Sequence, residues 1–418
     1  MSTLKFAYLH KVDGDANNNK FYKMQENADG TFTVTYGREG AAKPATETYS
    51  MDRWNEKFKE KLGPRKGYTD ITHLRALNEV KVDTKNSKGV SIISTDRHVD
   101  ELIKALQGYA NQVTQATYKV EAKAVTQIQI DTAQGHLDTL THSFKNHYGT
   151  SGWNLNLFNA ELTKLYIVIP RKMAKVADHL VTKDWTKGEI EKLIGDEQSN
   201  LDAMASQVTT NTASAAGDAV DAPSTTLLDQ LGLEVSLVTD KKTLDMVKAK
   251  AQNHAHRVLR VFAVTNKATQ KVYDAAFSKA SDKKTDLLWH GSRNQNWIFI
   301  IQQGLKIRPS GAVHTGSMFS DGIYAASESD KSMGYTDNGR WVNGRANGKI
   351  YMALFEFYLG KQLVVHQHDS SCYDLNKTCP ARGYDSVWAK KGPSLYRDEY
   401  IVYKPEQCTI KYLIEFSV

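Results

Sequence analysis

The alternation of hydrophobic and polar residues near the N-terminus predicts a small sheet. The runs KFYKMQ and TFTVTY are joined by ENADG, a segment rich in turn-forming residues. Phe32, Val34 and Tyr36 recur with a period of two, so they are expected on one face of a strand. The following MDRWNEKFKEKLG spaces its apolar residues as a helix does, and Gly63 and Pro64 provide a stop. This region is therefore predicted to be a hairpin followed by one helix.

The pattern then changes to a helical period. Lys81 to Gly89 lacks apolar periodicity and is predicted to be a linker. An amphipathic helix is predicted from Val99 to Val113, with a cap among residues 94–96. Further helical segments are predicted at residues 121–142, 154–169 and 227–238. Residues 200–224 are small and polar, which predicts a flexible loop.

From residue 237 onward the chain contains runs rich in β-branched and aromatic residues, which are typical of buried strands. These runs are HRVLRVFAVT, TDLLWHGS, KIYMALFEFYLG, DEYIVY and TIKYLIEF. They predict a mixed sheet with few helices. A chain of 418 residues exceeds one ordinary core. We therefore predict a multidomain α+β protein with domains at residues 1–85, 90–236 and 237–418.

Composition places the chain among globular proteins, with 40% hydrophobic and 24% charged residues. No apolar run reaches the roughly 18 residues of a membrane span, and MSTLKFAYLHK lacks the apolar core of a secretory signal. An intracellular, soluble protein without a membrane partner is expected. The three cysteines, Cys372, Cys379 and Cys408, lack paired spacing, which predicts free thiols and no metal site.

A net charge of +7 is compatible with a polyanionic partner. Basic residues are dense in the first domain and alternate with aromatic ones, as in nucleic-acid-binding surfaces. The candidates are Lys20, Lys23, Tyr36 and Arg38. A solvated charged face explains the same pattern, because Glu56 and Glu60 lie among the lysines.

Candidate chemistry is concentrated in the last domain. The sequence has no P-loop and no GxGxxG fingerprint, which disfavours a Walker ATPase or a Rossmann dehydrogenase. Three clusters remain: His290-Gly291-Ser292, the segment GIYAASESDKSMGY, and Glu399 in YRDEYIVY. Taken singly, each has an ordinary structural explanation as a core histidine, packing aromatics or a strand carboxylate.

In this order and with these spacings, the three clusters resemble the diphtheria-toxin-like catalytic domain of poly(ADP-ribose) polymerases. HGSRNQNWIFIIQQGLKI is similar to the first motif of that family, GIYAASESDKSMGY to the second and DEYIVY to the third. Upstream, Tyr36, Gly37 and Arg38 stand where a WGR domain has Trp-Gly-Arg. The helical segment is similar to the regulatory domain of DNA-dependent members.

The resemblance implies an NAD+ site and a role for each matching residue. Glu399 would hold the nicotinamide-ribose 2′-hydroxyl and help to activate the acceptor. The intrinsic chemistry agrees, because an oxocarbenium-like ribose is stabilised by a nearby carboxylate. His290 would position the adenosine ribose, Gly291 and Ser332 the carboxamide, and Tyr324 and Tyr335 the nicotinamide ring. Further contacts would come from Ser292, Asn296, Lys306 and Lys331.

The resemblance also implies a transferase activated by DNA strand breaks or nicks. Its acceptors would be proteins, including the enzyme itself, and Glu399 favours chain elongation. Arg397 stands near the acceptor pocket where an aromatic residue is common, which leaves the acceptor open. The alternatives are a mono-ADP-ribosyltransferase acting on protein or nucleic-acid ends, or a DNA-end-binding scaffold with a vestigial pocket. The expected location is the nucleus if the source is eukaryotic, and the cytoplasm or nucleoid if it is bacterial or viral.

Overall fold

The computed structural model describes residues 4–14, 16–75, 92–216, 226–307, 318–340, 342 and 348–418. The chain divides into two compact units. Unit 1 comprises Met1–Ser87 and Gln112–Thr209, and unit 2 comprises Lys88–Asn111 and Thr210–Val418. The predicted linker and the boundary between the first two predicted domains lie outside the described residues. The other domain boundaries remain predictions.

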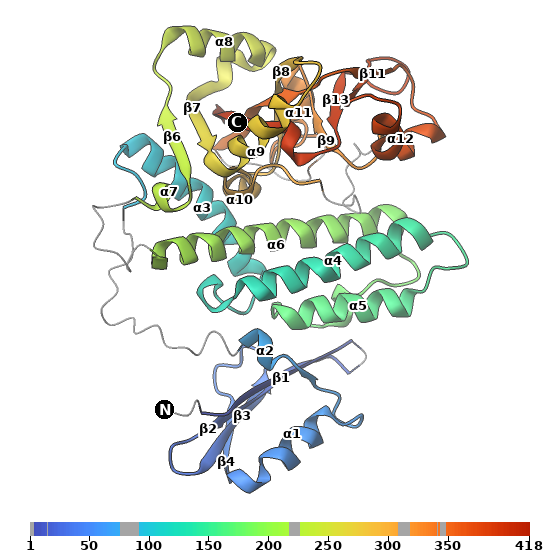
Figure 1. Ribbon diagram of the computed structural model, residues 1–418. Helices are drawn as coiled ribbons and strands as arrows, with labels where there is room; N and C mark the ends of the chain where they lie inside the picture. Colours follow the sequence, from blue (N-terminus) through green and yellow to red (C-terminus); the bar gives the residue numbers. More distant parts are fainter. Residues whose placement is uncertain are drawn as a thin grey trace. The chain divides into compact units, whose positions relative to one another are not determined.

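The sheet of unit 1 has five strands in the order β4-β3-β2-β1-β5, and α1 packs against it (Figure 1). Its elements are β1 (Phe6–Asp13), β2 (Asn18–Glu26), β3 (Thr31–Arg38), β4 (Ala45–Ser50), α1 (Trp54–Leu62), β5 (Thr69–Asp70) and α2 (Thr72–Arg75). Phe32 and Val34 are buried in a core with Trp54, as their period of two predicts. The predicted hairpin and the helix ending at Gly63 are confirmed.

The helices of unit 1 begin with the caps that the sequence provides. They are α4 (Gln127–His147), α5 (Leu155–Val168) and the part of α6 (Lys187–Ala216) up to Thr209. Thr126 and Gln129 form a capping box, and the Asn154 side chain accepts from the Leu157 N–H. Strand β1 lies against α5 through buried His10, whose Nδ1 is 3.3 Å from the carbonyl oxygen of Ile167.

The prediction of a flexible loop at residues 200–224 was wrong for its first part, because α6 continues to Ala216. Leu201, Met204, Ala205 and Val208 are buried and recur at helical spacing. The small polar residues between these positions obscured that stripe. Residues 217–225 lie outside the described part of the chain.

Unit 2 contains two sheets. The first has the order β6-β7-β14-β10-β8 and the second β11-β12-β13-β9. The strands are β6 (Leu233–Leu237), β7 (Val258–Asn266), β8 (Thr285–Gly291), β9 (Ile323–Ala325), β10 (Lys349–Tyr358), β11 (Gln362–Val365), β12 (Ser386–Ala389), β13 (Glu399–Val402) and β14 (Cys408–Ser417). Every strand predicted from the apolar runs is present. Among the described residues of unit 2, the strands pair antiparallel except β11 with β12.

Unit 2 holds more helices than the sequence predicted. The helices from residue 237 on are α8 (Lys241–Ala251), α9 (Lys267–Ser278), α10 (Trp297–Gln303), α11 (Ser329–Met333) and α12 (Leu375–Ala381). They are short, so their periodicity is hard to distinguish from that of buried strands. The single helix predicted at residues 227–238 is a one-turn helix, α7 (Leu227–Gln230), followed by β6. Gly232 ends the turn with a φ of +65°.

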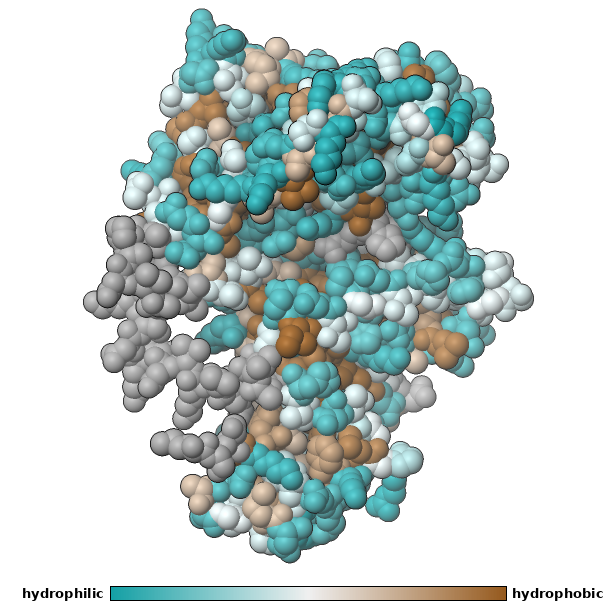
Figure 2. All heavy atoms as spheres, viewed as in Figure 1, coloured by the Kyte–Doolittle hydropathy of each residue, from teal (hydrophilic) through white to brown (hydrophobic). Residues whose placement is uncertain are grey.

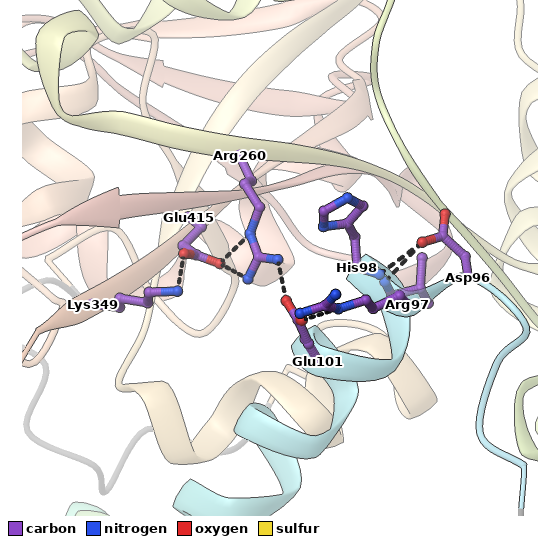
Figure 3. A network of polar contacts seen from close by, with 8 residues as sticks. Asp96, Arg97, His98, Glu101, Arg260, Lys349 and Glu415 are labelled. Atoms are coloured by element: carbon purple, nitrogen blue, oxygen red, sulfur yellow. Dashed lines mark hydrogen bonds and ion pairs between the residues drawn. The ribbon is translucent and has the colours of Figure 1, made fainter.

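Helix α3 (Arg97–Thr117) begins in unit 2, where Asp96 caps it as predicted, accepting from the His98 N–H at 2.8 Å. Figure 3 shows how its first turn is connected to the large sheet. Arg260 on β7 lies 3.1 Å from Glu101 and 2.7 Å from Glu415. Lys349 also pairs with Glu415, at 2.6 Å, and Glu415 is 1% exposed.

Large hydrophobic residues form the interior of unit 2. Buried residues of β7, β8, β10 and β14 make one core cluster with α8, and a second cluster lies on β12, β13 and α12. Much of the surface that unit 2 presents in Figure 2 is hydrophilic. The three cysteines are free, as predicted, and all three are buried.

Candidate active site

Backbone contacts bring the three sequence clusters together where the two sheets of unit 2 meet. Trp289 at the end of β8 exchanges backbone hydrogen bonds with Ala326, which follows β9, at 2.8 and 3.0 Å. Strand β9 also pairs with β13, where Tyr324 is opposite Ile401. The first, second and third clusters therefore lie on neighbouring strands.

Gly291 lies so close to α11 that no other residue fits there. A β-carbon built on Gly291 would be 1.9 Å from the carbonyl oxygen of Ser332 and 2.7 Å from its carbonyl carbon. The Ser332 hydroxyl donates to the carbonyl oxygen of Trp289 at 3.0 Å. The first and second clusters are thus held together by direct backbone contact, which explains the glycine independently of any ligand.

The orientation of the His290 ring is fixed by its surroundings. Nδ1 lies 3.0 Å from the carbonyl oxygen of Tyr324, and the ring meets Trp297 and Phe355 edge-on, with centroid distances of 6.4 and 6.1 Å. A carbonyl oxygen only accepts, so Nδ1 carries a proton. The Tyr324 carbonyl therefore fixes the Nδ1 side of the ring, and the assignment of His290 to the adenosine ribose remains a prediction.

Both tyrosines of the second cluster are close to Glu399. The Tyr324 hydroxyl donates to the carbonyl oxygen of Ser320 at 2.7 Å and accepts from the Phe319 N–H at 3.0 Å. The Tyr335 N–H donates to the carbonyl oxygen of Ser332 at 3.1 Å, at the end of α11. Burial raises the pKa of both phenols, and the charge of Glu399 adds to each shift.

Glu399 combines deep burial with one cationic neighbour. Glu399 is 3% exposed, and its Oε1 lies 2.7 Å from Nζ of Lys331, whose side chain is 14% exposed. Oε2 is buried without a hydrogen-bond partner among the described residues. Burial raises the pKa of Glu399, and Lys331 opposes that shift. A buried carboxylate oxygen without a partner is costly, so this site is suited to a ligand hydroxyl.

The residues expected on the adenosine side lie beyond β8. Asn296 donates from its side-chain amide to the Ser292 hydroxyl at 3.0 Å. Lys306 is exposed and follows α10 in the chain. Their contacts with a ligand remain predictions.

The ion pairs of Arg397 were not predicted from the sequence. Arg397 lies 2.8 Å from Glu328 and 3.9 Å from Asp330, and Asp330 also lies 3.6 Å from His254 and 3.7 Å from Arg340. These ion pairs connect the segment before β13 to the start of α11. The available signal in the sequence was the pair of acids Glu328 and Asp330, which precede Lys331 in the second cluster.

The proposed nucleic-acid residues lie on β2 and β3 in unit 1. Lys20 is opposite Arg38 in the strand register, and it is exposed. Lys23 has its ammonium group 5.3 Å from the centroid of the Phe6 ring. The Tyr36 hydroxyl donates to Glu47 at 2.6 Å.

Arg38 is bonded within the chain. Its guanidinium donates to the carbonyl oxygens of Asn17 and Ala174, both at 2.9 Å. Ala174 follows α5, so Arg38 joins the small sheet to the helical segment of unit 1.

Among the residues that the structure describes, no group of three or more histidine, cysteine, aspartate or glutamate side chains could hold a metal ion. No helix there is long and apolar enough to cross a bilayer.

Two family models match the chain, one for each sequence resemblance. The "Poly(ADP-ribose) polymerase catalytic domain" model matches residues 240–418, which include every residue of the candidate active site around Glu399 in unit 2. The "WGR domain" model matches residues 5–74.

Individual relatives are also similar to parts of the chain. Putative poly [ADP-ribose] polymerase-like 100L of Invertebrate iridescent virus 6 is 29% identical over 166 residues, covering 39% of this chain and 87% of the viral protein. Uncharacterized protein 101L of the same virus is 30% identical over 195 residues, covering 47% of this chain and 74% of that protein. Protein mono-ADP-ribosyltransferase PARP3 of Mus musculus is 31% identical over 176 residues, covering 34% of this chain and 30% of the mouse protein.

The site and these matches define the class of protein as an ADP-ribosyltransferase that uses NAD+ as its substrate. The chain belongs to the poly(ADP-ribose) polymerase family and is a member that carries a WGR domain.

Proposed function

We propose that this chain transfers ADP-ribose from NAD+ to itself and to other proteins, elongates ADP-ribose chains and is stimulated by DNA strand breaks. The observation that carries the proposal is Glu399, whose Oε2 is buried without a partner among the described residues while Oε1 pairs with Lys331.

Glu399 has the properties that the transfer step requires. The bond between nicotinamide and ribose breaks, nicotinamide leaves with the bonding electrons, and the ribose passes through an oxocarbenium-like state. A carboxylate stabilises this positive charge most effectively in a dry environment. The acceptor then forms a bond to the same ribose carbon and loses its proton, for which Glu399 is the proposed base.

NAD+ fits the polar groups of the site. The unpartnered Oε2 of Glu399 suits a ribose hydroxyl, and Gly291 with Ser332 is assigned to the carboxamide. Tyr335 is assigned to the face of the nicotinamide ring. Because the Ser332 hydroxyl already donates to Trp289, it would change partner or receive a second hydrogen bond when the substrate binds.

On the adenosine side, His290 is assigned to the ribose. The carbonyl oxygen of Tyr324 sets the orientation of the His290 ring. The proposed role of His290 is therefore to position the adenosine ribose rather than to act as a general base. Ser292 and Asn296 are assigned to the same end of the substrate, and their mutual hydrogen bond keeps them side by side. Lys306 supplies positive charge that a diphosphate-bearing substrate favours, whereas Lys331, which pairs with Glu399, is assigned to use of the acceptor.

Stimulation by DNA is proposed from unit 1. Lys20 is exposed and suits a phosphate, and Tyr36 offers a ring for a terminal base or sugar. Arg38 supports a relay, because it bonds to the carbonyl oxygen of Ala174 beyond α5. A change at the small sheet would thereby be transmitted to the helical segment.

Labelled NAD+ tests this proposal when the full chain is incubated with and without nicked DNA. We expect a ladder of high-mass products that increases when nicked DNA is present. Intact duplex DNA of the same length is the matched control for the break. A single discrete band would instead identify a mono-ADP-ribosyltransferase, and no labelled product would identify a binding scaffold. Equal turnover with and without breaks would eliminate the relay.

A further inference from the structure

Strand β13, which begins with Glu399, belongs to a sheet whose opposite face carries a second group of residues suited to a nucleotide. In the register of the second sheet of unit 2, Val364, Trp388 and Tyr400 lie side by side on β11, β12 and β13. Their neighbours Leu363, Val387 and Ile401 point into the core, so these three lie on the opposite face. Tyr400 directly follows Glu399, which shares the core-facing side.

Trp388 is the centre of this face. Its ring stacks on Tyr400 with a centroid distance of 5.8 Å and an interplanar angle of 14°. Its Nε1 donates to Oδ2 of Asp398 at 2.8 Å, which fixes the plane of the indole. The indole and Val364 are both partly open to solvent, with Val364 41% exposed. An oriented, accessible ring of this kind is suited to stacking with a base.

Two lysines approach the indole. Nζ of Lys390 is 4.3 Å from the ring centroid and Nζ of Lys284 is 5.8 Å from it. Lys284 also donates to the side-chain oxygen of Gln362 at 2.5 Å. Neither ammonium group takes part in an ion pair found among the described residues.

Two carboxylates that act on Tyr400, those of Asp398 and Asp286, are already engaged. Oδ1 of Asp398 accepts from the Lys391 N–H at 2.7 Å, while Oδ2 accepts from Trp388. Asp286 lies 3.4 Å from Lys250 and accepts from the Leu287 N–H. The two lysines near Trp388 therefore carry positive charge that nearby carboxylates neutralise only partly.

We propose that this face binds the ADP-ribose unit of the enzyme's own product, with adenine against Trp388 and the diphosphate at Lys284 and Lys390. Two ammonium groups match the two negative charges of one diphosphate. Three adjacent strands span roughly 10 Å, which suits one nucleotide unit better than a long polymer. Modified acceptors leave from Glu399 on the other side of β13, so the product forms near this face.

The proposal requires only that the chain makes ADP-ribosylated products, and it holds for single units as well as for chains. Product held at this face would keep a modified acceptor close to the enzyme between transfers. It would act as a binding site without a role in the chemical step, because its residues point away from Glu399.

Direct binding of ADP-ribose to the full chain tests the proposal. Isothermal titration should show two sites per chain, one at the NAD+ site and one at this face. The double variant Lys284→Glu, Lys390→Glu should weaken the second site about tenfold or more and leave the initial rate of NAD+ turnover unchanged. Trp388→Leu should weaken it similarly; the lysine variant remains decisive if Trp388→Leu fails to fold.

The matched control is Lys241→Glu, Lys242→Glu, which changes the charge equally at exposed positions of α8. It should retain both sites. One site in the unmodified chain, or identical titrations for the two double variants, would overturn the proposal. The chain could instead bind a single-stranded oligonucleotide more tightly than ADP-ribose and lose that binding in the Lys284→Glu, Lys390→Glu variant. That result would overturn the proposal in favour of a nucleic-acid surface. Because binding is measured directly, absence of chain elongation or of DNA stimulation does not affect the outcome.

Discussion

Replacing Gly291 by alanine should damage the site severely. The new β-carbon would lie 1.9 Å from the carbonyl oxygen of Ser332, 2.7 Å from its carbonyl carbon and 3.3 Å from its α-carbon. Backbone atoms cannot rotate out of the way as a flexible side chain does. Strand β8 and α11 must therefore separate by about 1.5–2 Å to restore an ordinary van der Waals contact.

This separation should affect activity more than stability. Overpacking of this kind costs roughly 1–3 kcal/mol of folding free energy. Displacing reacting groups by about 1 Å costs around a hundredfold in rate. We therefore expect Gly291→Ala to remain folded and to lose about a hundredfold in NAD+ turnover.

Release of nicotinamide, measured together with thermal unfolding, checks both expectations. Gly108→Ala is the matched control, because Gly108 lies in α3 and a β-carbon there meets no atom within 4 Å. It should keep its activity and gain about 0.5–1 kcal/mol in stability, since alanine is the better helix former. Normal turnover in Gly291→Ala would refute the argument that contact between β8 and α11 sets the geometry of the site.

Three further predictions concern charged residues. Lys331→Met removes the cation that lowers the pKa of Glu399, so the acid limb of the rate–pH profile should move to higher pH. Lys331→Arg keeps the positive charge and should return the acid limb to its original pH. An acid limb that does not move in Lys331→Met would contradict the coupling of Lys331 to Glu399. Arg38→Ala should reduce the ratio of DNA-stimulated to basal turnover by about tenfold, as measured with nicked DNA, whereas an unchanged ratio would exclude this residue from the relay. Glu415→Gln should lower the free energy of unfolding in denaturant by about 2–4 kcal/mol, because Glu415 is buried between Arg260 and Lys349. Glu101→Gln, at the exposed end of the same network, should lower it by less than about 1 kcal/mol. Equal losses for the two variants would contradict the difference in burial.

The elements that the sequence predicted are those with strong local signals. The strand containing Trp289 and the one beginning at Glu399 both follow from continuous apolar runs. The helix of Leu201 and Val208 was missed because few large residues mark its buried stripe. The short helices of unit 2 are stabilised by packing against the sheets, which local periodicity does not report.

The sequence predicted the composition of the site but not its contacts. The close approach of Gly291 to Ser332 depends on two elements that are distant along the chain. The pairing of Arg397 with Glu328 arises in the same way from separate loops. Spacing within a motif indicates which residues share a site, whereas hydrogen-bond partners and burial depend on long-range packing.

Nicotinamide release by Glu399→Gln, with NAD+ binding measured on the same preparation, tests the central claim most directly. Glutamine keeps the size of the side chain and one oxygen acceptor but lacks the charge that stabilises the ribose cation. We predict that NAD+ still binds, while turnover falls by at least a hundredfold. Turnover equal to that of the unmodified chain would contradict the role of Glu399 and the mechanism built on it.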